Sequence, residues 1–342
     1  MKRINYFILI LSIGVLAACK KETPATPTNT GETFANGVFI VCEGNFSQGN
    51  AAVSFFHKDT KQVEPDVFSK INNYPLGDVF QSMYGDGSHY FLVVNNSQKI
   101  EMLDAQTFKT QKSIQGFNSP RYYLPFQNKA FVTDFGANAI WVLDADQNIK
   151  SKIPVSGWTE QMLVFNNELF VTKVKHGSCV LVIDPVNEKV IDSIPVGEEP
   201  QWIVKDKEDK LWVLTNAYIK SKPANLQRID PATRKVLSSF SFPSVNDAPG
   251  RLKINAGLDT LYYLDNGVYK MGIHDAQLPT QAFVASGKQC YGLGLDLATG
   301  TIYASDAIGF TQRGIVFRYT SNGTLLDSFR CGIGPGDFYF VK

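Results

Sequence analysis

A two-part phrase recurs seven times along this chain of 342 residues, and it constrains the fold more than any other feature. Its second part is an apolar-apolar-Asp turn, with the Asp at 104, 144, 184 and 230 in the clearest copies, at intervals of 40, 40 and 46 residues. Its first part is a Gly/Pro-marked turn that opens a strand, as in Gly197 to Trp202. A period in the low forties with several strands in each repeat is typical of a β-propeller.

We therefore predict an all-β fold, a seven-bladed β-propeller with four-stranded blades over residues 37–342, which allots about 44 residues to each blade. Strand A follows the Gly/Pro turn, and strand B is a β-branched and aromatic run such as Leu211–Leu214. Strand C ends in the Asp turn, and strand D follows it. The Asp is predicted to be structural, because its carboxylate binds backbone N–H groups in the turn. His57 replaces it in the first repeat and is interpreted as a turn residue. Blade six, around Tyr269–Gly272, is the poorest copy.

The two ends of the chain do not hold whole blades. Gly37–Val41 has the pattern of a strand B, whereas Pro335–Val341 has the pattern of a strand A with nothing after it. We expect the last strand to complete the first blade by pairing with Val38–Val41, because such closure protects open sheet edges.

The first 36 residues differ in composition from the rest. Two basic residues precede an apolar stretch from Tyr6 to Leu16, as in a secretory signal. Leu16-Ala17-Ala18-Cys19 resembles a bacterial lipobox, so we predict a lipoprotein signal peptide at residues 1–19 with Cys19 as the lipid attachment site. An uncleaved anchor is the alternative, but the apolar run is short for a spanning helix. Residues 20–36 are rich in Pro and Thr and are predicted to be a disordered tether.

Charge and cysteine content restrict the partners. The formal net charge is +1, so nothing indicates nucleic acid or a polybasic membrane patch, and the lipid anchor is the expected membrane contact. We also expect a monomer. The four cysteines after the signal include no C-x-x-C pair, which argues against a zinc site. We interpret them as buried free thiols. A Cys42–Cys331 disulfide is the alternative, because export permits disulfides.

Two stretches resemble a known family. Val41–Phe56 and Pro75–Met83, the latter followed by Val93–Ser97, are similar to the opening of the YncE-like seven-bladed propeller lipoproteins of Bacteroidota. The resemblance spans the mature chain and implies the same fold. Relatives within or close to that family include BtuG-type surface lipoproteins, which capture cobalamin and pass it to a TonB-dependent transporter. The resemblance therefore implies a corrinoid as candidate ligand, such a transporter as candidate partner, and an outer-membrane location in the cell envelope, with the membrane face left open.

The strand A openings place one side chain at an equivalent position in each blade, near the channel mouth. Arg121 and Arg251 lie three blades apart, so we expect their planar donor groups to face a shared cavity and to clamp an anionic or amide-rich ligand. The alternative is a structural ring that satisfies strand ends and channel water. The predicted ring consists of Gln81, Arg121, Gln161, Gln201, Arg251, Tyr291 and Asp337.

Aromatic residues in the loops of the same face add a predicted contact surface. Large apolar groups in glycine-flanked loops are costly to leave in water, so several together favour a binding surface. Each one alone can instead fold back onto its blade. They are Phe46, Phe135, Tyr218 and Phe310 in B-to-C loops and Trp158 in a D-to-A turn.

Signals of catalysis are weak. The four histidines have no metal-binding spacing, and the sequence has no Gly-x-Ser-x-Gly elbow or glycine-rich phosphate loop. Gln and Arg occupy most ring positions where a calcium-dependent hydrolase needs oxygen ligands, so we predict no metal, cofactor or catalytic residue. The sequence thus favours a non-enzymatic protein that binds a small molecule at the channel mouth and passes it to a transporter. A protein-interaction scaffold is the alternative, and a metal-dependent hydrolase is the third.

Overall fold

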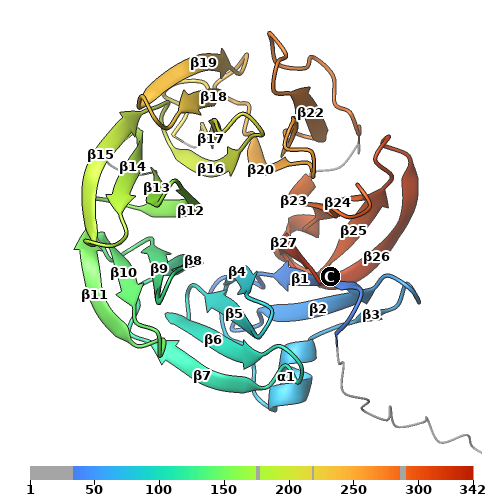
Figure 1. Ribbon diagram of the computed structural model, residues 1–342. Helices are drawn as coiled ribbons and strands as arrows, with labels where there is room; N and C mark the ends of the chain where they lie inside the picture. The colour runs from blue at the N-terminus through green and yellow to red at the C-terminus, as the bar shows by residue number, and fades with distance from the viewer. Residues whose placement is uncertain (1–33, 175–177, 218, 286–289, 342) are drawn as a thin grey trace, which may run out of the picture. The chain divides into compact units, whose positions relative to one another are not determined.

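Seven antiparallel sheets follow one another around a ring in the computed structural model (Figure 1). The structure describes residues 34–174, 178–217, 219–285 and 290–341. The predicted signal peptide with Cys19, and the predicted tether as far as residue 33, lie outside these ranges. Within them, no helix has the length and apolar character needed to cross a membrane. The fold is the predicted all-β, seven-bladed β-propeller.

Blades two to seven are antiparallel meanders whose strands follow one another in chain order. Blade two consists of β4 (Phe80–Gly85), β5 (His89–Val94), β6 (Lys99–Asp104) and β7 (Thr110–Gln115). Blade three consists of β8 (Pro120–Phe126), β9 (Lys129–Asp134), β10 (Ala139–Leu143) and β11 (Ile149–Pro154). Blade four consists of β12 (Thr159–Phe165), β13 (Glu168–Lys173), β14 (Cys179–Asp184) and β15 (Lys189–Pro195). Blade five consists of β16 (Pro200–Lys205), β17 (Leu211–Thr215), β18 (Asn225–Asp230) and β19 (Lys235–Ser241). Blade six consists of β20 (Gly250–Ile254), β21 (Thr260–Leu264) and β22 (Val268–Gly272). Blade seven consists of β23 (Cys290–Leu295), β24 (Ile302–Asp306), β25 (Arg313–Tyr319) and β26 (Leu325–Ile333).

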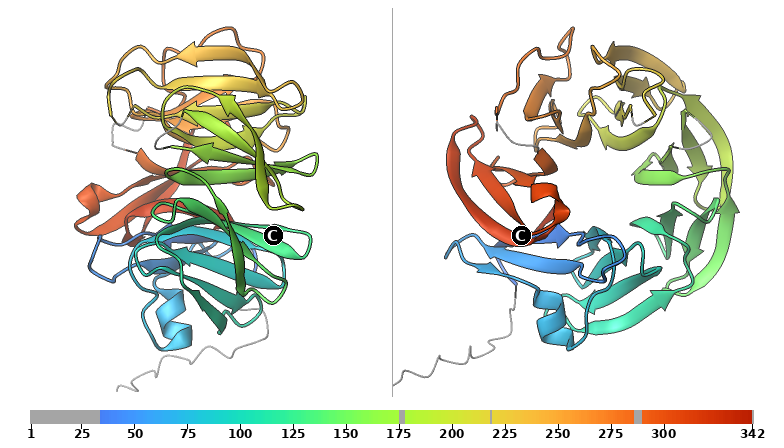
Figure 2. Two further views of the ribbon diagram at one scale, coloured as in Figure 1. Left: turned by 90° about the vertical axis from the view of Figure 1, so that its left-hand side faces the viewer. Right: turned by 180° about the vertical axis from the view of Figure 1, so that it is seen from behind.

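The two ends of the chain form blade one together, as predicted. Its strands are β27 (Pro335–Phe340), β1 (Gly37–Cys42), β2 (Ala52–His57) and β3 (Val63–Glu64), in that order across the sheet. Phe338 lies opposite Ile40 in the register. The view from behind in Figure 2 shows the C-terminal strand beside β1, where the ring closes. The closure therefore makes β27 the innermost strand of blade one and covers the edge of β1 that would otherwise be unpaired.

Blade six departs from the four-stranded prediction. In the described part of the chain its sheet has three strands, β20 to β22. The place of the fourth is taken by a single bridge, in which Val284 and Val268 exchange backbone hydrogen bonds of 3.1 and 3.0 Å. The segment after β22 includes Pro279, which lacks the N–H that a continuous ladder needs. In the described residues, blade six thus has three strands and a single bridge in the fourth position.

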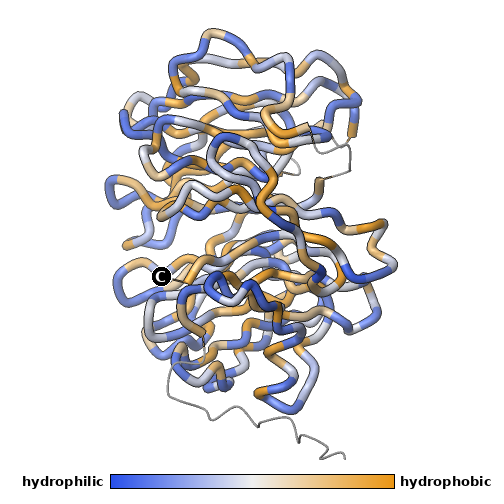
Figure 3. The backbone as a smooth tube through the Cα atoms, turned by 90° about the vertical axis from the view of Figure 1, so that its right-hand side faces the viewer, coloured by the Kyte–Doolittle hydropathy of each residue, from blue (hydrophilic) through white to orange (hydrophobic). Residues whose placement is uncertain are grey.

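The core lies between neighbouring blades. Its largest members come from the predicted strand B runs, such as Phe91, whose ring stacks on Tyr123 of the next blade at 4.1 Å between centroids. Figure 3 shows these apolar strand segments in orange and many of the connecting turns in blue. Phe34 belongs to the segment predicted to be a tether, but its ring is buried and packs on Phe39 and Phe55 at 5.0 and 4.7 Å between centroids. The ordered fold therefore begins before Gly37, because an aromatic cluster includes this ring.

The repeated Asp residues have the predicted structural role. Asp104 Oδ1 accepts hydrogen bonds from the backbone N–H groups of Gln106 and Thr107 at 3.1 and 2.8 Å. Asp184 Oδ1 likewise accepts hydrogen bonds from the backbone N–H groups of Val186 and Asn187 at 2.9 and 3.0 Å. His57, at the equivalent place in blade one, accepts a turn hydrogen bond from Lys61 N–H at its carbonyl (2.8 Å).

The four cysteines of the described region are free thiols, and two of them meet where the ring closes. Cys42 on β1 and Cys331 on β26 are both fully buried. The contact with Cys42 and burial together hold the pKa of the Cys331 thiol well above its usual value.

Candidate functional site

The inner strand of every blade is irregular at the channel mouth. The register shifts between Pro120 and Tyr123, for example, so Arg121 and Tyr122 fall in a β-bulge. Such bulges redirect side chains that a regular alternation would turn away from the channel. The other shifts lie between Phe80 and Ser82, Thr159 and Met162, Pro200 and Trp202, Gly250 and Lys253, Cys290 and Leu293, and, in the β1–β27 pair, at Val41 and Cys42.

Hydroxyl groups of neighbouring strands hold the backbone around these bulges. Ser82 Oγ donates to the carbonyl of Arg121 at 2.6 Å. Thr172 Oγ1 donates to the carbonyl of Gln201 at 3.2 Å, and Ser305 Oγ donates to that of Pro335 at 2.5 Å. These hydrogen bonds satisfy backbone carbonyls that the irregular pairing would otherwise leave without a partner. The bulges are thereby stabilised, and with them the direction of their side chains toward the channel.

Five of the seven predicted ring residues line one cavity of about 530 Å³ at the mouth. They are Gln81, Arg121, Gln201, Arg251 and Tyr291, and Phe46 lines the same cavity. The remaining lining residues are Glu43, Val79, Asn95, Tyr122, Glu160, Trp202, Asn216, Ala248, Gly250, Leu264 and Cys290.

The other two ring residues, Gln161 and Asp337, line a second cavity of about 280 Å³ in the channel. Asp337 Oδ1 is paired there with Lys253 Nζ at 2.8 Å. Gln161 Oε1 accepts a hydrogen bond from the backbone N–H of Ile203 at 3.2 Å. Tyr122 lines both cavities, so its ring lies between them. The predicted ring is thus divided between two chambers.

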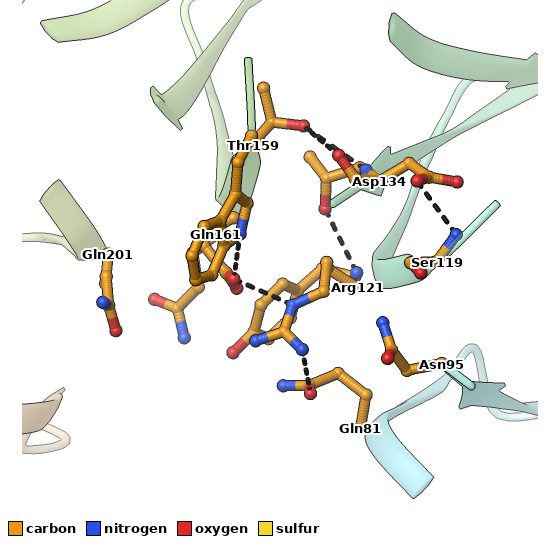
Figure 4. Close-up of polar contacts among 12 residues, drawn as sticks. Gln81, Asn95, Ser119, Arg121, Asp134, Thr159, Gln161 and Gln201 are labelled. Carbon is orange, nitrogen blue, oxygen red and sulfur yellow. Dashed lines mark hydrogen bonds and ion pairs between the residues drawn. The ribbon is translucent and has the colours of Figure 1, made fainter. Parts of the chain in front are cut away.

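Arg121 is the centre of a cluster formed by blades two, three and four. Its Nε donates to Glu160 Oε1 at 2.8 Å, and its Nη1 donates to Gln81 Oε1 at 2.5 Å. The indole Nε1 of Trp158 donates to the same Glu160 oxygen, and the guanidinium lies 5.8 Å from the indole ring. Figure 4 shows Gln81, Arg121 and Gln161 in succession, with Gln201 beyond them. Burial raises the pKa of Glu160 above its usual value, although Arg121 opposes the shift.

Arg251 forms a corresponding cluster with blades seven and one. Its backbone has a left-handed φ of 58°, and its Nη2 donates to Glu43 Oε1 at 3.3 Å. Tyr291 donates its hydroxyl to Glu43 Oε2 at 2.7 Å, and the guanidinium lies 4.9 Å from the tyrosine ring. Gly336 makes room for this pair, because a Cβ at that position would lie 2.2 Å from Glu43 Oε1.

The two arginines are therefore not free donors that await an anion. Each guanidinium is matched by a carboxylate, Glu160 in one cluster and Glu43 in the other. The sequence prediction included neither glutamate in the ring, although both are close in sequence to predicted site residues. A polar cavity remains, but its arginine charges are compensated from within the fold.

The predicted aromatic surface is divided. Phe46 and Phe135 are 72% and 47% exposed, and Phe135 packs edge-on against Trp158 with centroids 4.3 Å apart. Phe310 is only partly exposed and packs edge-on against Tyr291 at 4.7 Å. Tyr218 lies outside the described residues.

Tyr122 is the residue that the sequence prediction missed most clearly. In the described part of the chain its hydroxyl has no hydrogen-bond partner, and neither has the side-chain amide of Gln201. Burial, with the nearby Glu160 carboxylate, raises the pKa of Tyr122 to about 12 and keeps the phenol neutral. Across the described residues, no group of three or more His, Cys, Asp and Glu side chains is arranged to hold a metal ion.

A seven-bladed propeller with a polar cavity at its channel mouth is the class of protein that this geometry defines. The chain belongs to the family described as a domain of unknown function, DUF5074, which matches residues 36–330. No curated protein matches the sequence.

Solved structures with the same fold are numerous and distant in sequence. A quinoprotein alcohol dehydrogenase-like protein from Bacteroides thetaiotaomicron has a TM-score of 0.70 and 17% identity, over 90% of this chain and 78% of that one. The periplasmic gluconolactonase of Pseudomonas aeruginosa has a TM-score of 0.68 and 14% identity, over 90% and 99%. A protein of unknown function from Desulfotomaculum acetoxidans has a TM-score of 0.67 and 14% identity, over 90% and 99%. At these identities the likeness establishes the fold alone.

Proposed function

We propose that this propeller binds a small polar molecule at its channel mouth without changing it chemically. One observation carries the proposal. The cavity of about 530 Å³ has the Tyr122 hydroxyl and the Gln201 amide in its wall, and neither group has a hydrogen-bond partner in the described residues. Polar groups that a rigid scaffold holds in a recess without a partner in the protein can bond a ligand there. The volume is in the usual range for small-molecule sites, about 300–1,000 Å³.

The cavity is also held in shape before a ligand arrives. The bulge carbonyls are bonded to hydroxyl groups, and the guanidinium groups are held by carboxylates and aromatic rings. A site whose side chains are already fixed loses little conformational entropy on binding. That property favours capture of a ligand at low concentration.

The sequence adds a cellular setting to this proposal. The lipobox at Cys19 and the resemblance to BtuG-type proteins support an outer-membrane lipoprotein that passes its ligand to a TonB-dependent transporter. A corrinoid is the ligand that the resemblance suggests. The exposed rings of Phe46 and Phe135 favour the second candidate, a protein-interaction scaffold, because exposed aromatic groups often anchor interfaces.

A hydrolase is the third candidate, and the ion pairs argue against it. Among the described residues, the carboxylates that line the two cavities are Glu43, Glu160 and Asp337, and each is paired with an arginine or a lysine. A divalent cation would have to compete with those partners for the same oxygens.

A thermal-shift screen with cyanocobalamin, haem, oligosaccharides and divalent metals tests the proposal, since a ligand that binds only the folded state raises its melting temperature. Tyr122→Phe and Gln201→Leu each remove one polar group from the wall, and each should weaken the binding of a hit. The matched control is Tyr74→Phe, whose hydroxyl donates to Thr110 Oγ1 away from the cavity (2.7 Å). Unchanged binding in both cavity variants contradicts the proposal.

A further inference from the structure

The charge around the mouth cavity is balanced residue by residue. Arg121 is paired with Glu160 at 2.8 Å, and Arg251 is paired with Glu43 at 3.3 Å. All four side chains line the cavity and are at least four-fifths buried. In the second cavity, Lys253 and Asp337 form a third pair. The formal charges of these six side chains cancel.

This balance determines which ligand charge the cavity favours. Two opposite charges that lie close together in a partly buried site attract each other more strongly than they would in bulk water. An anion near either guanidinium would also lie near that guanidinium's carboxylate, so attraction and repulsion offset each other. The same argument applies to a cation with the signs reversed. A ligand without formal charge avoids the desolvation cost that either an anion or a cation would have on entering the cavity.

The polar groups that remain available are of mixed type. The Tyr122 hydroxyl and the Gln201 amide each offer both donors and acceptors. Beside them lie Arg121 Nη2, Arg251 Nη1 and Glu160 Oε2, which have no hydrogen-bond partner among the described residues. Closely spaced donors and acceptors fit hydroxyl groups, because a hydroxyl donates one hydrogen bond and accepts others.

Aromatic rings supply the apolar part of the cavity. Phe46 and Trp202 line it together with Tyr122 and Tyr291. Phe46 is 72% exposed, so its ring is available to a ligand. The C–H face of a sugar ring packs well on such a surface, while its hydroxyl groups reach the polar wall.

We infer that the mouth cavity takes a small neutral saccharide, held between the Arg121–Glu160 pair and the Arg251–Glu43 pair with a sugar face against the aromatic rings. The inference rests on the proposed function of the mouth as a ligand site. It adds the chemical class of the ligand and excludes acidic sugars.

Calorimetric titration with charge-matched trisaccharides tests the inference. Cellotriose, maltotriose and mannotriose are the neutral probes, and trigalacturonate is the acidic one. We expect at least one neutral probe to bind, and to bind at least tenfold more tightly than trigalacturonate. Glu43→Gln and Glu160→Gln should each weaken that neutral probe roughly ten- to a hundredfold and strengthen trigalacturonate, because each leaves a guanidinium unmatched. The control is Glu188→Gln, which breaks a comparable ion pair with Lys129 at 2.7 Å, outside both cavities.

The outcomes separate this inference from the proposed function. Tighter binding of trigalacturonate to the wild-type protein overturns the saccharide inference. The saccharide inference is also overturned if a non-saccharide binds at the mouth and its binding is weakened by Tyr122→Phe, while none of the neutral trisaccharides binds at millimolar concentration. If a neutral trisaccharide binds but is indifferent to Tyr122→Phe, Glu43→Gln and Glu160→Gln alike, the site lies elsewhere and the proposed function fails as well.

Discussion

The closure of the ring depends on Phe338, and Phe338→Ala is the sharpest test of it. Phe338 lies on β27 opposite Ile40 of β1, and its ring packs against Tyr303 of blade seven with centroids 5.7 Å apart. It is 8% exposed. The fit on the blade seven side is close, because a Cβ on Gly294 would lie 2.8 Å from Phe338 Cβ. One side chain thus joins the last strand of blade one to blade seven.

The expected cost follows from that burial. Truncation of a buried phenylalanine to alanine typically costs about 3–5 kcal/mol, since the lost apolar contact is combined with a residual cavity. Total stabilities of folded domains are about 5–15 kcal/mol, so this one change should remove a large share of the stability. We expect Phe338→Ala to lower the urea midpoint markedly and to leave the slope of the transition unchanged, provided that unfolding stays cooperative.

Equilibrium urea unfolding followed by tryptophan fluorescence measures this loss. Phe46→Ala is the control, because Phe46 is 72% exposed and surface substitutions usually change stability by no more than about 0.5 kcal/mol. If Phe338→Ala unfolds at the same urea concentration as Phe46→Ala, the last strand does not stabilise the closed ring and the reasoning is refuted.

Three further predictions follow from single contacts. Gly336→Ala should displace Glu43 from Arg251, because the new Cβ would lie 2.2 Å from Glu43 Oε1. We expect a melting temperature close to that of the wild type and weakened ligand binding. Unchanged ligand binding would contradict this prediction. The pKa of Asp206 is lowered, because the opposing effect of burial is outweighed by hydrogen bonds from Lys210 N–H, Trp212 and Arg228. The stability that Asp206 contributes is therefore present above the ordinary aspartate pKa and is lost as the pH falls through the lowered value. Asp206→Asn should therefore reduce the difference in unfolding free energy between pH 7 and pH 3, and an undiminished difference refutes this. Cys19→Ser should release the protein from membrane fractions, since the predicted lipid is its anchor; full retention in membranes overturns the lipobox interpretation.

The propeller and its closure were predictable because they depend on local patterns that repeat. The Asp turns and the aromatic strand B runs fixed the blade period, and Pro335–Val341 had no partner within its own repeat. Blade six was not predictable in detail, because its fourth position is one bridge at Val284 after a segment without a strand pattern. The burial of Phe34 could not be predicted from its surroundings in sequence, because two of the rings that cover it, Phe55 and Phe108, are distant in the chain.

The candidate site was predictable only in part. A regular strand alternates its side chains, so the alignment selected one inward residue from each blade. The bulge between Pro120 and Tyr123 instead brings Arg121 and Tyr122 to the channel together. Charge compensation was also hidden, because Glu43 and Arg251 are 208 residues apart in the sequence. Contacts of that range depend on the closed ring and cannot be found from one repeat.

The most direct test of the mouth as a ligand site blocks the cavity without removing any of its polar groups. Ala248 lines the cavity and is exposed, so Ala248→Trp places a large ring in the opening. Ala145→Trp is the control, because Ala145 is exposed in the turn between β10 and β11 and lines neither cavity. The measurement is calorimetric titration of both variants with the compound that gives the largest thermal shift. The account predicts that Ala248→Trp abolishes binding while Ala145→Trp binds like wild type; wild-type affinity in Ala248→Trp would contradict it.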